Sequence, residues 1–134
     1  MAYTAESESP DQYHLWTALS TISGAVQRKP FFQYQYFLLY PNMYTVLVGP
    51  PGRCKKSTAM RIGRGILSTV PEVSFTSDSV TRERLILDMS QCLKDGHSSM
   101  TAYNSEFASF LANSAMLGSM GVTTGAIVMR SAVI

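Results

Sequence analysis

A glycine- and proline-rich loop with two lysines and two hydroxyl residues is the part of this sequence best suited to chemistry. The loop occupies residues 49–58, after an apolar run at 44–48 and before a segment with helical spacing. A buried strand, such a loop and a helix form an anion site, because backbone N–H groups and the amino end of the helix surround a phosphate. A lysine then contacts the terminal phosphates, and a hydroxyl ligates magnesium. The expected phosphate-binding residues are Gly49, Pro50, Pro51, Gly52, Arg53, Cys54, Lys55, Lys56, Ser57 and Thr58.

The loop departs from the common pattern G-x-x-x-x-G-K-[ST] and aligns with it in two ways. Counted from Gly49, Cys54 takes the second glycine position, Lys55 the lysine position and Lys56 the hydroxyl position. Counted back from Ser57, Lys56 is the lysine and the loop is one residue longer. We prefer the second alignment, because a lysine followed directly by a hydroxyl serves both phosphate and magnesium. The missing second glycine leaves open a degenerate loop, or a basic surface turn without a ligand.

A hydrolytic nucleotide site also needs an acidic residue that orients magnesium or water, usually at the end of a neighbouring strand. Asp78 follows the apolar residues 73–75, and Glu106 follows the segment 100–103. Each also has a structural interpretation, since Asp78 would cap a turn and Glu106 would be a charge that the helix dipole favours. The expected catalytic residues are Lys56 with Asp78 or Glu106. Ser57 is the expected magnesium ligand, and ATP and magnesium are the expected cofactors.

A helix and an aromatic segment precede the loop. The run Ser9-Pro-Asp-Gln12 has the residue types of a helix start with a capping box, and Pro30 ends the helical pattern. The face expected to turn inward consists of Leu15, Trp16, Leu19, Ile22 and Val26. Residues 31–40 include six aromatic residues in a partly alternating order, which predicts an extended, hairpin-like segment. We expect these rings to pack in the core; the alternative is that they stack on bases of single-stranded nucleic acid.

From residue 44 onward, short apolar runs alternate with helical patterns. Strands are expected at residues 44–48, 73–75, 98–103 and within 126–134, and helices at 57–67, 81–93 and 106–117. The strand at 44–48 is almost free of polar residues and is expected to be buried in a parallel sheet. Gly63 and Gly65 weaken the helix at 57–67 by about 1 kcal/mol each, and close packing against the sheet would explain them. This order predicts an α/β fold with right-handed crossovers.

Composition narrows the class of protein. The 134 residues are 46% hydrophobic and 15% charged, which is typical of one folded domain rather than of a disordered chain. No acidic residue lies between Asp11 and Glu72, so the basic residues of that stretch predict a cationic surface. Those residues are Arg28, Lys29, Arg53, Lys55, Lys56, Arg61 and Arg64. Two cysteines and no leader pattern indicate a cytoplasmic setting, and no apolar run approaches the roughly 20 residues of a membrane span, so no membrane partner is expected.

Several segments of the chain resemble the amino-terminal part of phage and prophage replication proteins of the primase-helicase kind, which are RecA-like P-loop ATPases. The matching segments are Tyr3-Thr-Ala-Glu-Ser-Glu-Ser-Pro10, His14-Leu-Trp16, Pro41-Asn-Met-Tyr44, Val48-Gly-Pro-Pro-Gly52 and Lys56-Ser-Thr58. The resemblance covers most of residues 3–111. Members of that family often have a basic residue directly before the loop lysine, so the Lys55-Lys56 pair is similar to the family form.

The resemblance implies a three-layer, RecA-like parallel sheet that is incomplete in this chain. Residues 1–42 would form an N-terminal helix and aromatic segment, and residues 43–134 a partial P-loop NTPase core. Asp78 and Ser105-Glu106 match the segments after the second and third strands of the family. The implied activity is magnesium-dependent ATP hydrolysis by a homo-oligomer on DNA. The remaining sheet and the arginine finger would lie beyond residue 134, so the chain is expected to be an N-terminal fragment that binds nucleotide.

The sequence is also compatible with two other functions. One is a nucleic-acid-binding module in which the basic segment contacts the backbone and the loop is degenerate and non-hydrolysing. The other is a P-loop kinase for a small molecule or nucleotide, which would also need a lid and an acceptor site.

Overall fold

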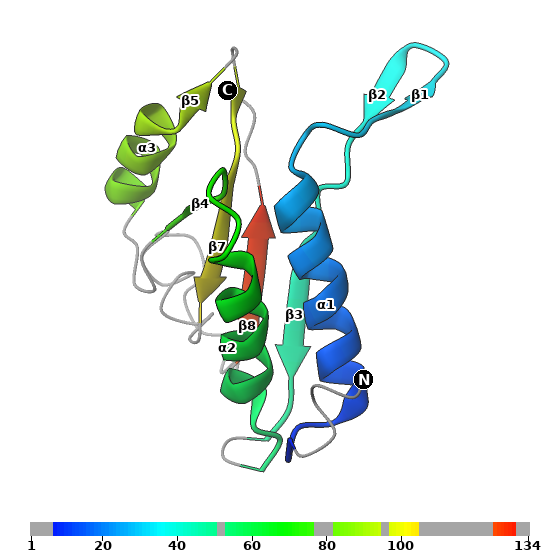
Figure 1. Ribbon diagram of the computed structural model, residues 1–134, viewed down its shortest axis with the longest axis vertical. Coiled ribbons are helices and arrows are strands. Elements are labelled where there is room, and N and C mark those ends of the chain that lie inside the picture. Colours follow the sequence, from blue (N-terminus) through cyan, green and yellow to red (C-terminus); the bar gives the residue numbers. More distant parts are fainter. Residues whose placement is uncertain (1–6, 51–52, 77–81, 95–96, 105–124, 131–134) are drawn as a thin grey trace, which may run out of the picture.

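The computed structural model describes residues 7–50, 53–76, 82–94, 97–104 and 125–130 (Figure 1). Helix α1 (Asp11–Val26) leads into the hairpin of β1 (Phe32–Tyr34) and β2 (Phe37–Leu39). Strand β3 (Thr45–Val48) precedes helix α2 (Lys56–Leu67), and β4 (Ser74–Phe75) precedes helix α3 (Arg82–Gln91). The short pair β5 (Leu93–Lys94) and β6 (His97–Ser98) is followed by β7 (Met100–Asn104) and β8 (Gly125–Arg130). This mixture of helices and strands confirms the α/β class.

A four-stranded sheet in the order β3-β8-β7-β4 is the centre of the described part of the chain. Strands β4 and β7 pair in parallel, whereas β8 is antiparallel to both β3 and β7. Strands β3, β7 and β4 therefore run in the same direction and end at the same edge of the sheet. The expectation of a wholly parallel sheet is wrong for the last strand. Strand β8 follows β7 in the chain and pairs with it antiparallel. Two antiparallel neighbours can be joined without a crossover connection, which parallel neighbours require.

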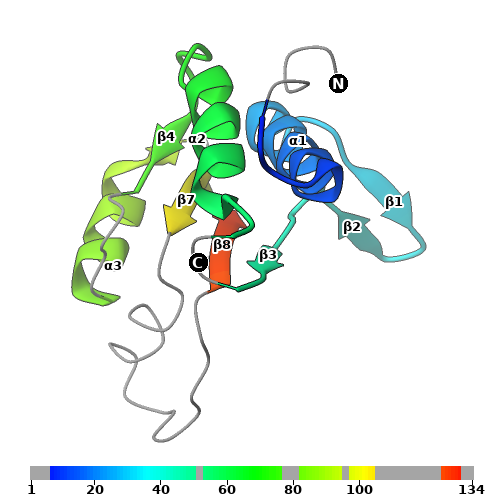
Figure 2. The same ribbon diagram turned by 90° about the horizontal axis from the view of Figure 1, so that it is seen from below.

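Strand β3 is an edge strand among the described strands, and it is only half buried. Thr45 and Leu47 are buried, while Val46 and Val48 point to the other face and are exposed. The prediction of a fully buried strand is therefore wrong, because the helices α1 and α2 lie together on one face of the sheet (Figure 2). On that face Leu47 belongs to a small core with Met60, Leu67 and Tyr103.

Helix α1 begins where the sequence predicts it, but it is rotated relative to the predicted orientation. Its buried side consists of small and polar residues: His14, Thr17, Ser20, Thr21, Ser23 and Gly24. The apolar residues Leu15, Trp16, Leu19 and Ile22 are exposed. The cause is a close approach to α2, in which a Cβ on Gly63 would lie 2.4 Å from the Thr17 Cγ2 atom. Small residues permit this approach, and the buried Ser20 hydroxyl bonds to the Thr45 hydroxyl at 2.6 Å.

The aromatic hairpin is outside the core, contrary to prediction. Every residue of β1 and β2 is exposed, and Figures 1 and 2 show the hairpin projecting from the carboxyl end of α1 away from α2. Its base is held by the Arg28 guanidinium, which lies 4.0 Å from the centre of the Tyr40 ring. The predicted strand at 73–75 and the helix at 81–93 are confirmed in shortened form, and the strand predicted at 98–103 is found as β7, shifted toward residue 104. The helix predicted at 106–117 lies outside the described residues. Across the described ranges, no helix combines the length and apolar character needed to cross a bilayer.

Candidate phosphate-binding site

Lys56 closes the loop between β3 and α2. It is the first residue of α2, its side chain is folded back, and its ammonium donates a hydrogen bond to the Gly49 carbonyl. Only 8% of the residue is exposed. The first residue of the loop and the first residue of the helix are thus joined by a hydrogen bond, so the ammonium lies at the mouth of the loop rather than in solvent.

Lys55, its neighbour, is directed elsewhere. Its backbone φ is 43°, in the left-handed region that favours glycine, and it directly precedes the helix. Its ammonium lies 3.2 Å from the Glu8 carboxylate, and its side chain is half exposed. The two adjacent lysines therefore differ: the Lys56 side chain turns into the loop, and the Lys55 side chain turns out toward the segment before α1.

Three basic residues lie at the amino end of α2. Arg53 and Lys55 precede the helix, Lys56 begins it, Glu8 pairs with Lys55, and the first turn of the helix has no acidic residue. A helix amino end already carries a partial positive charge, so cations at this position raise the local potential and an anion would lower it. Ser57 and Thr58 are exposed on the same first turn, where their hydroxyl groups are accessible to a ligand or to a hydrated cation.

The segment before and within the first turn of α1 supports both ends of the loop. The buried Ser9 hydroxyl donates a hydrogen bond of 2.6 Å to the Lys55 carbonyl, and the Tyr13 hydroxyl donates one of 2.7 Å to the Val48 carbonyl. Desolvation raises the pKa of the Tyr13 phenol, and the neighbouring Cys54 thiol adds to that rise. The phenol therefore stays protonated at neutral pH and keeps its proton for the Val48 carbonyl.

Gly49 has a packing role at this point. A Cβ on Gly49 would lie 2.4 Å from the Tyr13 hydroxyl oxygen and 3.1 Å from the Cys54 Sγ atom. A contact under 3.0 Å requires a shift, so a side chain at position 49 would displace the Tyr13 hydroxyl from its hydrogen bond to the Val48 carbonyl. The loop, Cys54 and helix α1 are in this way packed as one unit.

Sequence reasoning missed the contribution of Glu8, Ser9 and Tyr13. It assigned Ser9 to the helix cap, but the N-cap residue is Pro10, which has no side-chain cap bond, and the Ser9 hydroxyl instead donates a hydrogen bond to the Lys55 carbonyl. No local pattern signals a contact between residues 46 positions apart in the chain. The hydrogen bonds of Ser9 and Tyr13 to the loop could only be found from the fold.

Four of the predicted site residues, Pro51, Gly52, Asp78 and Glu106, lie outside the described residues. The strands that lead toward the two acids are described: β4 and β7 end at the same edge of the sheet as β3. Asn104 at the end of β7 and Val46 in β3 both face Ile127 on β8, so β7 lies two strand spacings, about 10 Å, from β3.

The side chains available for a cation are limited. Within the described ranges no group of three or more His, Cys, Asp or Glu side chains is placed to hold a metal ion. The exposed Ser57 hydroxyl fits magnesium as a single protein ligand, because magnesium usually keeps several waters and takes further oxygens from phosphates.

Comparison with protein families, curated proteins and solved structures found no match for this chain.

Proposed function

We propose that residues 49–57 bind the phosphates of ATP together with magnesium. The observation that carries the proposal is the left-handed backbone of Lys55, directly before Lys56. In the common pattern glycine occupies the position before the lysine. Lys55 has the backbone conformation that a glycine would adopt there, and the Lys56 ammonium reaches back across the loop. These features favour the alignment in which Lys56 and Ser57 are the functional lysine and hydroxyl.

Each residue then has a defined task in this proposal. The Lys56 ammonium exchanges the Gly49 carbonyl for the β- and γ-phosphates, and the Ser57 hydroxyl ligates magnesium. The backbone N–H groups of the loop, including those of Arg53, Cys54 and Lys55, surround the phosphate at the amino end of α2. Asp78 or Glu106 would orient the attacking water, because both follow strands that end at the same sheet edge as β3.

At the level of the whole protein, we infer an ATP-binding domain of a DNA replication helicase or primase-helicase from a mobile element. The support is the sequence resemblance, together with the three strands that share one direction and end at the side of the loop. In this proposal the complete protein has a RecA-like core and hydrolyses ATP as an oligomer on DNA. The antiparallel β8 between β3 and β7 departs from the expected parallel sheet. On the resemblance alone, the proposal assigns ATP turnover to the complete protein.

A second candidate is a nucleic-acid-binding module with a degenerate, non-hydrolysing loop. It is favoured by the seven basic residues that the sequence places between Asp11 and Glu72 with no acidic residue among them, although two of the seven, Lys29 and Lys55, pair with Glu72 and Glu8 in the structure. A P-loop kinase has less support, because no acceptor site is recognisable among the described residues. Affinity for nucleic acid that falls steeply with salt and does not respond to nucleotide would favour the binding module.

The decisive test is magnesium-dependent ATP binding by the wild-type chain, Lys56→Ala and Lys55→Ala, measured by titration calorimetry. Loss of a charge-assisted contact to phosphate costs about 1.5–3 kcal/mol, so Lys56→Ala is expected to bind roughly 10- to 100-fold more weakly. Lys55→Ala keeps a Cβ at the left-handed position and loses only a half-exposed ion pair, so it serves as the matched control with nearly unchanged affinity. Equal losses in both variants would contradict the assignment of Lys56.

A further inference from the structure

One face of the aromatic hairpin of β1 and β2 is a surface of exposed rings. The register pairs Phe32 with Leu39 and Tyr34 with Phe37. Directly opposite residues share a face of an antiparallel pair, and so do residues two positions apart on one strand, so these four side chains lie on the same face. Each is between 53% and 66% exposed. The rings do not pack in the core, contrary to the sequence prediction, and are therefore accessible to a ligand.

The spacing of the rings suits successive bases. Phe32 and Tyr34 are two residues apart on an extended strand, which places them about 7 Å apart. That distance is about twice the 3.4 Å between stacked bases, so an extended single strand can place neighbouring bases on neighbouring rings. Proteins that bind single-stranded nucleic acid use such exposed sheet faces, on which rings stack two or three bases. Tyr36, in the turn, adds a ring that is 98% exposed.

A hollow at the base of the hairpin lies next to a cation. The hollow has a volume of about 370 Å³ and is lined by Pro30, Phe31, Phe32, Leu39, Tyr40 and Pro41. The Arg28 guanidinium lies 4.0 Å from the centre of the Tyr40 ring, and none of the ion pairs found among the described residues involves it. Ring walls beside a guanidinium are the combination that holds a base together with its phosphate.

The charges around the hairpin favour an anionic partner. Residues 12–71 contain no acidic side chain, so no carboxylate of that stretch repels phosphate. Glu72 is paired with Lys29, which leaves Arg28 as the cation that serves the base of the hairpin. Residues 31–40 carry no charge, and stacking needs none, because every base presents an uncharged π-face to a ring.

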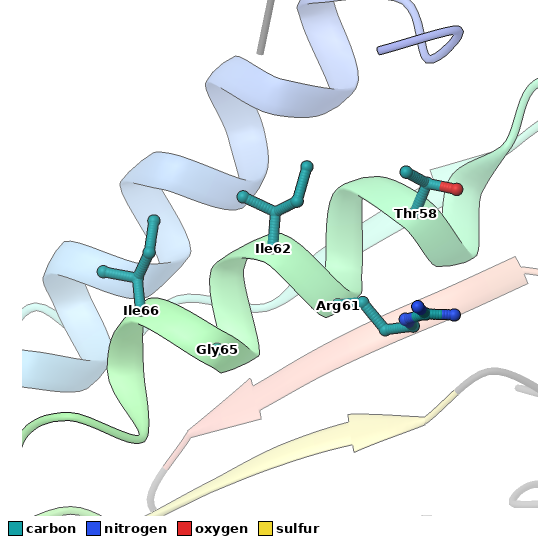
Figure 3. A pocket seen from close by; sticks show the side chains of 5 residues that line it. All are labelled: Thr58, Arg61, Ile62, Gly65 and Ile66. Carbon is teal, nitrogen blue, oxygen red and sulfur yellow. The ribbon is translucent and has the colours of Figure 1, made fainter. Parts of the chain in front are cut away.

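Arg61 is an exposed cation on a surface without rings. It lines a hollow of about 320 Å³ on α2, and Figure 3 shows its side chain on a different side of the helix from Ile62 and Ile66. The residues that line this hollow include no aromatic side chain. This part of α2 can therefore contact phosphates but cannot stack bases, and Arg61 is a suitable control for a purely electrostatic interaction.

A lipid surface is a less suitable partner for the hairpin. Aromatic residues do favour the boundary between water and lipid. The hairpin turn consists of Gln35 and Tyr36, however, so insertion of the tip would bury the Gln35 amide without a partner. On a nucleic acid the same amide can donate and accept hydrogen bonds at base edges.

We propose that the ring face of the hairpin, with Arg28 at its base, binds single-stranded nucleic acid. Phe32, Tyr34 and Phe37 stack on the bases, and Arg28 contacts a phosphate. The proposed function implies work on DNA without assigning a surface to it, and this inference rests on that function only for the choice of DNA over RNA. It uses no residue of the phosphate-binding loop, so its failure would leave ATP binding unaffected.

The test is fluorescence anisotropy of labelled oligothymidine titrated with the full chain, in the absence of nucleotide. Tyr34→Ala and Phe37→Ala are each expected to bind about 5- to 100-fold more weakly, the range found when a stacking ring is removed. Leu38→Ala is the matched control, because Leu38 pairs with Gln33 on the opposite face and is also exposed. It and Arg61→Gln are expected to change the affinity by less than about twofold. Circular dichroism must show each variant folded as the wild type.

Salt dependence separates stacking from the phosphate contact. The logarithm of the affinity falls with the logarithm of salt by about 0.7 per phosphate neutralised on a single strand, so Arg28→Gln is expected to lower this slope by about 0.7. Tyr34→Ala is expected to keep the wild-type slope. Tighter binding of oligouridine than of oligothymidine would identify RNA rather than DNA as the source of the strand.

Four results would overturn the proposal. The wild type fails to bind either oligonucleotide at roughly 50 mM salt; the ring variants bind as the wild type does; or Leu38→Ala loses as much affinity as they do. The fourth is that the rings are needed for binding to anionic lipid vesicles and not for binding to the oligonucleotides. An unchanged salt slope in Arg28→Gln would refute the phosphate contact.

Discussion

At the scale of single residues, adjacent side chains in the loop have opposite directions, and this separates their roles. Lys55 is half exposed beside Glu8, whereas Lys56 is buried against the Gly49 carbonyl. The sequence favoured Lys56, because a hydroxyl residue follows it directly, whereas Lys55 is followed by a second lysine. The backbone supplies the distinction: Lys55 occupies a left-handed position, and Lys56 begins the helix.

Ser57→Ala should separate magnesium binding from phosphate binding. Ser57 is exposed, so its replacement leaves the fold unchanged. If its hydroxyl ligates magnesium, the wild type will bind ATP more tightly with magnesium than after chelation by EDTA, and this difference will largely disappear in Ser57→Ala. Titration calorimetry with and without magnesium measures it. An undiminished magnesium effect in the variant would exclude Ser57 as the ligand.

Ser9→Ala tests whether the segment before α1 preorganises the loop. The variant loses the hydrogen bond to the Lys55 carbonyl, and the free energy of unfolding in urea is expected to fall by about 1 kcal/mol. ATP affinity should fall by roughly threefold to tenfold, because the loop would no longer be ordered before ATP binds, and the free-energy cost of ordering it would reduce the binding free energy. Ser68→Ala is a matched control, since its hydroxyl bonds an exposed carbonyl at the far end of α2. Lower stability with unchanged affinity would limit Ser9 to a structural role.

At the scale of elements, the sequence predicted where helices and strands lie better than it predicted which side they bury. The start of α1, the helix α2 and the strands β4 and β7 follow from the position of Pro10, from periodicity and from apolar runs. The buried side of α1 does not, because an apolar stripe normally marks the inward face. Here Gly63 admits Thr17 and Thr21 so closely that the small residues face inward. That choice depends on a contact between two helices, which no local pattern encodes.

Gly63 and Gly65 lie two positions apart on α2 and should respond in opposite ways to alanine. A Cβ at Gly63 would lie 2.4 Å from Thr17 and 2.9 Å from the Thr21 hydroxyl oxygen, so Gly63→Ala must separate α1 from α2. We expect a loss of about 1–3 kcal/mol in the free energy of unfolding. At Gly65 nothing lies within 4 Å, so Gly65→Ala should gain about 0.5–1 kcal/mol through helix propensity. Urea denaturation measures both, and similar shifts would refute the close helix contact.

At the scale of the whole molecule, the two ends of α1 serve different surfaces. Its amino end and the preceding residues hold the loop through Ser9 and Tyr13, and its carboxyl end holds the base of the aromatic hairpin. From its charge pattern the sequence predicted a cationic surface; of that set of residues, Lys56 is buried, and Lys29 and Lys55 pair with Glu72 and Glu8. The sequence could not predict that the hairpin is exposed, because alternating aromatic residues also suit a buried strand. Exposure is a property of what covers the element, and thus of the whole fold.

The most direct test of the central claim is to locate the bound nucleotide on the molecule. Backbone amide NMR spectra of the wild-type chain would be recorded during titration with magnesium and a non-hydrolysable ATP analogue. The account predicts that the largest chemical-shift changes fall on residues 53–57 and Gly49, with smaller changes at Ser9 and Tyr13 through their hydrogen bonds to the loop. Changes confined to the aromatic hairpin, with the loop amides unmoved, would contradict it.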